Sequence, residues 1–209
     1  IQIQAGKLTL DKSQIFDQFY SIGDEKISYG AMAVHHILEQ DIVDQPHFDT
    51  FQLPSETVYI IGHNIDYDIR TIEKCGVDSS KIKAICTLAL ARRAWPDAEA
   101  HNISALIYMI SKGSQRAREL LKGAHRADAD IILTANILMH IMHHLQVQDI
   151  EQLYALSEDA RIPRSLNFGK HKGTAIEELP KDYVQWLLRQ DDLDPYLRKA
   201  LEKNLVQTL

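Results

Sequence analysis

"TVYIIGHN" at residues 57–64 is a nearly unbroken apolar run that ends in glycine, histidine and asparagine. Such a run is typical of a strand that is buried on both faces of a sheet. Polar residues directly after a buried strand lie in the loop at its carboxyl end, where α/β proteins place functional groups. The stretch therefore predicts an α/β fold with a candidate site that begins at His63 and Asn64.

The segments on either side of this strand complete the predicted fold. Before it, residues 1–10 and 14–22 alternate apolar and polar side chains and predict an antiparallel hairpin. After it, residues 65–76 show helical spacing and stop at a glycine, and residues 84–96 form a second helical candidate that stops at a proline. A long helix is predicted from about residue 125 to 145. A hairpin, a buried strand and several helices indicate an α/β sandwich.

Composition limits the class of protein. The chain has 209 residues, 45% of them hydrophobic, which is enough to bury a substantial core. Its net charge of −6 argues against a surface that binds nucleic acid over its whole extent, so any such contact must be local. The two cysteines, Cys75 and Cys86, are too few for a disulfide framework, which favours a reducing cytoplasm. No apolar run reaches the roughly 18 residues of a membrane span, so no membrane partner is expected.

A change in composition near residue 160 predicts a separate module at the carboxyl end. We expect a main domain over residues 1–148, a linking helix and loop over 149–164, and a small module over 165–209. The module contains the basic turn "FGKHKG", with Lys170 and Lys172 between two glycines. Two interpretations of this turn are open: a solvated hairpin turn, or a turn that contacts phosphate groups of a nucleic acid.

Acidic side chains at the start of the long helix are the first candidates for chemistry. The stretch "HRADAD" at residues 125–130 carries Asp128 and Asp130. Both acids could cap backbone amides or interact with the helix dipole. At about 100° per residue, each lies on a flank of the predicted apolar stripe, so helical spacing leaves the choice open. That stripe consists of Ala127, Ile131, Thr134, Leu138, Ile141, Met142 and Leu145.

A second pair of acids follows the predicted buried strand. Asp66 and Asp68 lie in the first turn of the helix that begins after Asn64. Taken alone they also suit a helix start and an Asx-turn. Two acid-bearing helix starts near the open end of one sheet are different, because converging carboxylates repel one another unless a divalent cation lies between them. The combination favours a metal site.

These residues resemble the DEDDh exonucleases of the ribonuclease H-like fold, and within them the bacterial exodeoxyribonuclease X group. The family motif His-Asn-x-x-aromatic-Asp matches residues 63–68, which implies that Asp68 is a metal ligand. The motif His-x4-Asp matches His125 and Asp130, which implies a general base and a second ligand. "ISYGAMAVHHI" resembles the family's substrate-contacting segment and places His35 at its histidine. The stretch at 84–96 and the carboxyl-terminal module also resemble family segments.

The resemblance implies both a fold and an activity. The expected fold is a three-layer α/β/α sandwich with a mixed sheet. The expected function is a 3′–5′ exodeoxyribonuclease in DNA repair or turnover that uses two Mg²⁺ or Mn²⁺ ions and releases mononucleotides from DNA 3′ ends, chiefly of single strands. His35, Asn64 and His63 are the expected substrate-binding residues, together with Lys170 and Lys172.

One family motif has no counterpart in the chain. The Asp-x-Glu of the first strand is absent, and the sequence starts at Ile1 in an alternating pattern without a methionine. We therefore expect these two acids upstream of Ile1. Two alternatives stay open: an inactive relative that binds nucleic acid or a protein partner, and an RNA-directed exonuclease of the same superfamily. The sequence also leaves open whether the chain is a monomer or a homodimer.

Overall fold

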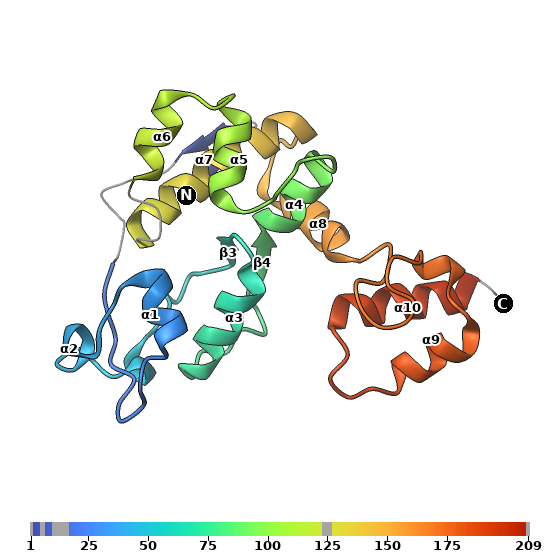
Figure 1. The fold of residues 1–209 in the computed structure, drawn as a ribbon, viewed down its shortest axis with the longest axis horizontal. Coiled ribbons are helices and arrows are strands. Elements are labelled where there is room, and N and C mark those ends of the chain that lie inside the picture. Colours follow the sequence, from blue (N-terminus) through green and yellow to red (C-terminus); the bar gives the residue numbers. More distant parts are fainter. Residues whose placement is uncertain (1, 5–6, 10–16, 123–126, 208–209) are drawn as a thin grey trace. The chain divides into compact units, whose positions relative to one another are not determined.

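The structure is a computed structural model that describes residues 2–4, 7–9, 17–122 and 127–207 (Figure 1). The chain divides into two compact units, Ile1–Ser157 and Glu158–Leu209. The boundaries expected from composition, at residues 148 and 164, remain a prediction. Among the described residues, no helix is both long enough and apolar enough to cross a membrane.

A short antiparallel hairpin opens the first unit. It pairs β1 (Gln2–Gln4) with β2 (Lys7–Thr9). The predicted second strand over residues 14–22 is not formed in its described part, 17–22, which contains only an isolated bridge from Ser21 to His47. The predicted hairpin is wrong in this respect, because the alternating residues 1–10 supply both strands.

The strand expected from "TVYIIG" is present and is paired in parallel. It is β3 (Tyr59–Gly62), and its partner is β4 (Lys83–Cys86). The register aligns Gly62 with Cys86, so both strands end at the same edge. The side chains of β3 are half-buried rather than fully buried.

The strand β4 corrects the helix predicted over residues 84–96. The segment begins as a strand and becomes helical only at α4 (Thr87–Ala94). A four-residue apolar run is compatible with a strand or with a buried helix segment, and periodicity does not distinguish the two. The parallel pairing of residues 83–86 with β3 identifies them as a strand. The described part of the fold is thus mixed α/β, with two parallel strands.

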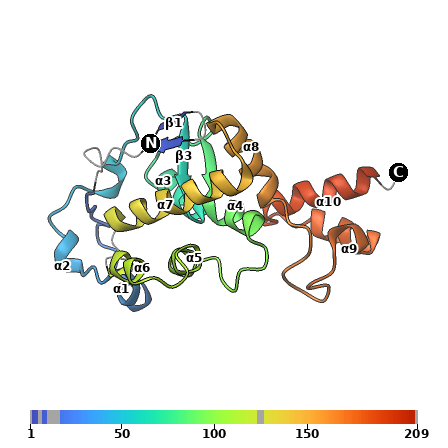
Figure 2. The ribbon, with the colours of Figure 1, turned by 90° about the horizontal axis from the view of Figure 1, so that it is seen from above.

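Helices make up most of the rest of the first unit, and Figure 2 shows α7 alongside α4 and α5. The predicted helix over 65–76 is confirmed as α3. Besides α4, the described helices of this unit are α1 (Tyr29–His35), α2 (Glu39–Ile42), α3 (Ile65–Lys74), α5 (Ile103–Ile110), α6 (Gln115–Leu121), α7 (Ala127–Leu145) and α8 (Ile150–Arg161), with a 3₁₀ turn at Phe48–Thr50.

The core of the first unit is built around α7. The fully buried side chains of this helix are Leu133, Ile137, Leu138, Ile141 and Met142. The predicted stripe is therefore rotated, because Ile131 was placed in it and is 37% exposed. Packing against α4 and α5 on one side selects this face.

The second unit has its own small core. It contains a 3₁₀ turn (Ile176–Glu178), α9 (Lys181–Leu188) and α10 (Pro195–Gln207). An isolated antiparallel bridge links Ser165 and Ala175. The buried side chains are Leu166, Ile176, Leu179, Val184, Leu187, Leu197, Ala200 and Leu201.

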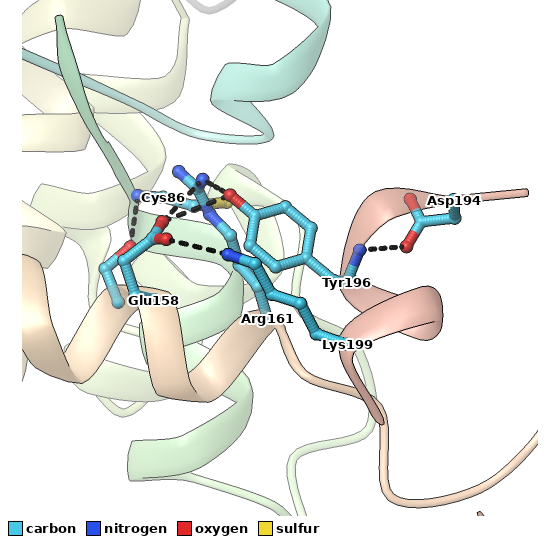
Figure 3. A network of polar contacts seen from close by, with 7 residues as sticks. Cys86, Glu158, Arg161, Asp194, Tyr196 and Lys199 are labelled. Atoms are coloured by element: carbon cyan, nitrogen blue, oxygen red, sulfur yellow. Dashed lines mark hydrogen bonds and ion pairs between the residues drawn. The ribbon is translucent and has the colours of Figure 1, made fainter. Parts of the chain in front are cut away.

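A polar network joins the last turn of α8 to α10 within the second unit (Figure 3). Glu158 accepts hydrogen bonds from Arg161 and from the Tyr196 hydroxyl, both at 3.1 Å, and pairs with Lys199 at 3.6 Å. The Arg161 guanidinium also donates to the Tyr196 hydroxyl and lies over its ring. The Arg161 side chain is only 5% exposed. The network therefore compensates the burial of this cation.

The end of β4 is held by a buried side chain of the first unit. The backbone N–H of Cys86 donates to Ser157 Oγ at 2.8 Å, and Ser157 is completely buried. A buried backbone donor without a partner is costly, so this hydroxyl allows β4 to end inside the core.

We expect Ser157→Ala to lower the free energy of unfolding by about 1–3 kcal/mol, because Cys86 N–H would lose its acceptor. Urea denaturation followed by circular dichroism measures the change. Ser55→Ala, which removes an exposed hydroxyl, is the matched control and should change stability little. Equal stabilities of the two variants would contradict the assignment.

Candidate nuclease site

A pocket of about 480 Å³ lies along β3 in the first unit and contains two of the predicted acids. Its walls come from β3, from the start of α3, from α7 and from Ile103 of α5. Asp68, Asp130 and His63 all line it. The pocket thus brings together carboxylates from two separate helices beyond the carboxyl end of a strand.

The position of Asp130 follows from the geometry of α7. Asp130, Thr134 and Leu138 are spaced four residues apart, share one face of the helix and all line the pocket. Leu138 is fully buried, so this face points inward. The structure therefore places Asp130 at the pocket, while the choice between a helix-start acid and a metal ligand remains a prediction.

Asp68 enters the pocket from the first turn of α3. Ile65 at the start of this helix is buried and fixes its position, and Asp68 lies one turn later. The side chain keeps considerable exposure, yet partial burial of its carboxyl raises the pKa of Asp68 above its ordinary value. Asp66, in the same turn, does not line the pocket. Of these two acids, only Asp68, the one that matches the family motif, lines the pocket.

Gly62 is a pocket residue that sequence reasoning did not single out. A Cβ at this position would lie 2.6 Å from Ile65 Cδ1 and 3.5 Å from Asp68 Oδ2. The first distance is far below van der Waals contact, so any side chain here would force the tip of the buried Ile65 side chain to shift. The signal in the sequence was the glycine at the end of an otherwise apolar strand.

His63 is held by the protein through both ring nitrogens. Nε2 lies 2.8 Å from the carbonyl oxygen of His101, and Nδ1 lies 3.0 Å from Thr87 Oγ1. A carbonyl can only accept, so Nε2 carries the hydrogen of that bond, and in neutral His63 the unprotonated Nδ1 can accept from the Thr87 hydroxyl. The single hydrogen of this hydroxyl then serves either Nδ1 or the Gly62 carbonyl, not both at once. Burial chiefly, with a contribution from the Arg92 cation, lowers the pKa of His63. Burial thus favours the neutral imidazole, and the two contacts hold the ring in place.

Thr87 is the second residue that sequence reasoning missed. It is the first residue of α4 and is completely buried. Besides the contact with His63, its Oγ1 lies 3.2 Å from the carbonyl oxygen of Gly62. One hydroxyl thus connects the start of α4 with the end of β3.

Two of the predicted substrate-binding residues lie outside the pocket lining. Asn64 adopts a left-handed conformation with φ of 68° as the residue before α3, and its side chain is exposed. His35 lies in the last turn of α1, where its Nδ1 accepts a hydrogen bond from the backbone N–H of Ile37 at 2.9 Å. Their roles, like that of His63, remain predictions.

Three other predicted residues cannot be placed at the pocket. His125 lies outside the described residues. Lys170 and Lys172 belong to the second unit and are described there on their own. The predicted base, His125, is therefore not placed relative to the pocket. The basic turn is a feature of the second unit alone.

The side chains of the pocket supply part of a metal site. Carboxylate oxygens are the ligands that Mg²⁺ and Mn²⁺ prefer, so Asp68 and Asp130 fit such an ion. Within the described ranges, no group of three or more His, Cys, Asp or Glu side chains could hold a metal ion. His63 does not extend the pair, because both of its nitrogens are engaged. The two acids thus fit an ion as part of a larger set of ligands.

Comparison with known proteins gives the family. No protein-family model matches the chain. The chain is 29% identical over 190 residues to exodeoxyribonuclease 10 of Escherichia coli, covering 88% of this chain and 82% of that protein. A solved structure, exonuclease X in complex with 5′ overhanging duplex DNA, matches with 30% identity and a TM-score of 0.50, covering 64% of this chain and 76% of that one. This chain belongs to the exonuclease X family.

A second relative extends the relationship. The 3′–5′ exonuclease DinG of Staphylococcus epidermidis is 29% identical over 175 residues, which are 76% of this chain and 18% of DinG. The exonuclease X family and this part of DinG thus share a common ancestry with the chain. The relationship to 3′–5′ exonucleases therefore extends over most of the length of this chain.

The lowered pKa of His63 predicts a specific dependence of stability on pH. Because the folded-state pKa lies below the unfolded value of about 6.5, the unfolded chain takes up a proton first as the pH falls. The stabilisation by neutral His63 is therefore complete above about pH 6.5 and is lost as the pH falls from there through the folded-state pKa.

Urea denaturation at pH 8 and pH 5.5 measures this effect. Acidification should destabilise the wild type more than it destabilises His63→Gln, which cannot titrate. His143→Gln, at an exposed position on α7, should behave like the wild type. The same loss on acidification in wild type and His63→Gln would refute the prediction.

Proposed function

We propose that the chain is a metal-dependent 3′–5′ exodeoxyribonuclease that acts on DNA 3′ ends, chiefly of single strands. The observation that supports it most is that Asp68 and Asp130 line one pocket at the carboxyl end of β3. Membership of the exonuclease X family makes this pocket the natural place for phosphodiester hydrolysis. A ribonuclease H-like three-layer sandwich, with β3 and β4 in its sheet, is part of the proposal.

Asp68 and Asp130 would hold divalent Mg²⁺ or Mn²⁺ in a two-ion site. When bound, such ions stabilise charge on the attacking and leaving oxygens of the phosphate. Two carboxylates are fewer than a two-ion site needs, so the proposal requires further oxygen ligands besides these two acids.

The other residues of the proposal act on the proton and on the substrate. His125 would accept a proton from the attacking water, a role that suits an imidazole near neutral pH. Asn64 and His35 would hold the terminal nucleotide. His63, engaged with Thr87 and the His101 carbonyl, would position the loop after β3 rather than take part in the chemistry.

The charge of Asp68 gives the first test, which is a measurement of metal binding. Because partial burial raises its pKa, ionised Asp68 destabilises the metal-free fold above its folded-state pKa. Asp68→Asn should therefore melt at a higher temperature than the wild type in EDTA at pH 7. Adding Mn²⁺ should stabilise the wild type, by about 2.7 kcal/mol at 100 times the dissociation constant, and should leave Asp68→Asn and Asp130→Asn unchanged.

The neighbouring acids provide matched controls for this measurement. Asp66→Asn and Asp128→Asn remove the same charge from the same helices and should retain the stabilisation by Mn²⁺. Thermal melting followed by circular dichroism detects all of these changes. A stabilisation that survives in both Asp68→Asn and Asp130→Asn would exclude these two acids as ligands.

Hydrolysis gives the second test. A 5′-labelled single-stranded oligodeoxynucleotide should be shortened from its 3′ end in Mg²⁺ and not in EDTA. Asp130→Asn should reduce the rate at least about 100-fold, since ion-dependent charge stabilisation is worth several kcal/mol, whereas Asp128→Asn should not. The assay is run on residues 1–209 and on the same chain with any residues encoded upstream of Ile1.

The substrates in this assay separate the alternatives. An oligoribonucleotide of the same sequence should be degraded more slowly if DNA is the substrate. Binding of DNA without hydrolysis by both versions of the chain would identify an inactive relative and overturn the proposal. Unchanged hydrolysis in Asp130→Asn would overturn the site.

A further inference from the structure

The basic turn of the second unit packs against an aromatic side chain of α9. The turn closes through hydrogen bonds from Gly173 N to the Leu166 carbonyl at 2.7 Å and from Leu166 N to the Thr174 carbonyl at 3.0 Å. Gly169 has φ of 66°, and a Cβ there would lie 3.0 Å from the Tyr183 hydroxyl. Glycine thus allows the turn both its backbone conformation and its close approach to Tyr183.

Three rings and a lysine gather where the turn meets α9. The rings of His171 and Tyr183 lie 4.5 Å apart, and Tyr183 stacks on Trp186 at 5.4 Å with an angle of 27° between the rings. The Lys170 ammonium lies 6.0 Å from the centre of the Tyr183 ring. We call this cluster of Lys170, His171, Lys172, Tyr183 and Trp186 the turn–α9 surface.

Trp186 is not part of the hydrophobic core of the second unit. The helix α9 is anchored by Val184 and Leu187, which are buried, whereas Trp186 is 51% exposed. Tyr183 and Trp186 are three residues apart and therefore lie on the same side of the helix. A tryptophan that is ordered by stacking on a neighbour and still half-exposed offers an aromatic surface to a planar ligand.

The charge of the segments next to these rings is positive. Residues 168–173 and 181–186 together contain three lysines and one aspartate, in a chain whose net charge is −6. Lys170 and Lys172 are exposed or half-exposed on the turn, and Lys181 is exposed at the start of α9. Aromatic rings next to lysines are the combination that binds single-stranded nucleic acid, because bases stack on the rings while the lysines contact phosphates.

We infer that the turn–α9 surface binds single-stranded DNA, with a base stacked on Trp186 and neighbouring phosphates contacted by Lys170 and Lys172. The inference rests on the proposed function, which makes DNA the ligand. The surface lies in the second unit and the candidate pocket in the first, so it adds binding without adding chemistry.

Fluorescence of the full chain tests the stacking directly. In EDTA, which prevents hydrolysis, a long oligodeoxythymidylate should quench the tryptophan emission of the wild type. The quenching should be largely absent in Trp186→Phe, which leaves only Trp95 to report. Fluorescence polarisation of a labelled strand should show that Trp186→Phe still binds, since phenylalanine also stacks on bases.

Removal of the ring should weaken binding itself. Trp186→Ala should lower the affinity for the single strand roughly tenfold, as expected for the loss of one stacked base. Tyr108→Ala, which removes a 40% exposed ring from α5 in the first unit, is the matched control and should bind like the wild type. Duplex DNA of equal length should bind more weakly than the single strand, because paired bases cannot stack on a side chain.

Removal of the lysines should change the dependence on salt. The double variant Lys170→Ala with Lys172→Ala should flatten the plot of log affinity against log salt by about 1.4, or 0.7 for each phosphate contact. Lys74→Ala with Lys203→Ala removes the same charge from other exposed positions and should leave this slope unchanged.

A small substrate separates this inference from the proposed function. The p-nitrophenyl ester of thymidine 5′-monophosphate reports on hydrolysis and offers no strand to bind. Trp186→Ala should hydrolyse it like the wild type, and Asp130→Asn should bind the single strand in EDTA while failing to hydrolyse the ester.

Wild-type binding by Trp186→Ala and by the double lysine variant, or equal binding of duplex and single strand, would overturn the inference and leave the nuclease proposal intact. Loss of hydrolysis in all forms of the chain with retained, Trp186-dependent binding would overturn the nuclease proposal and leave the inference intact.

Discussion

The contact of the Thr87 hydroxyl with the end of β3 is the constraint on which the candidate site depends. Because β3 and β4 are parallel and Gly62 aligns with Cys86, the two strands end side by side, and the next residue on each strand leaves the sheet. Thr87 joins these exits, since its Oγ1 contacts both the Gly62 carbonyl and His63. These contacts therefore fix the start of the loop that leads into α3, the helix that contains Asp68.

Much of the fold could be predicted from the sequence where the signal was long or strongly marked. The strand at "TVYIIG", the helix that stops near Gly76 and the long helix that ends at Leu145 all have counterparts in the structure. The strand β4 could not be predicted, because four apolar residues before a helix are read as part of that helix unless the partner strand is known. The buried face of α7 was misplaced for a related reason: it is decided by the neighbours α4 and α5 rather than by the helix itself.

The site shows the same division between local and tertiary information. The acids could be found because their spacing within a motif is local, and the structure places Asp68 and Asp130 in one pocket, while their roles as ligands remain a prediction. Gly62 left only a weak signal, a glycine at a strand end, and Thr87 left none, because the role of each depends on a contact that the sequence does not show. Residues that hold a site in place leave weaker marks in a sequence than residues that act in it.

The close fit at Gly62 has a consequence for the divergence of related chains. The space beside its Cα is filled by Ile65 Cδ1, so an alanine or larger residue requires this side-chain tip to shift, and its Cβ would lie 3.5 Å from Asp68 Oδ2. The glycine therefore marks the pocket: its replacement would change the packing of Ile65 at the start of the helix that carries Asp68.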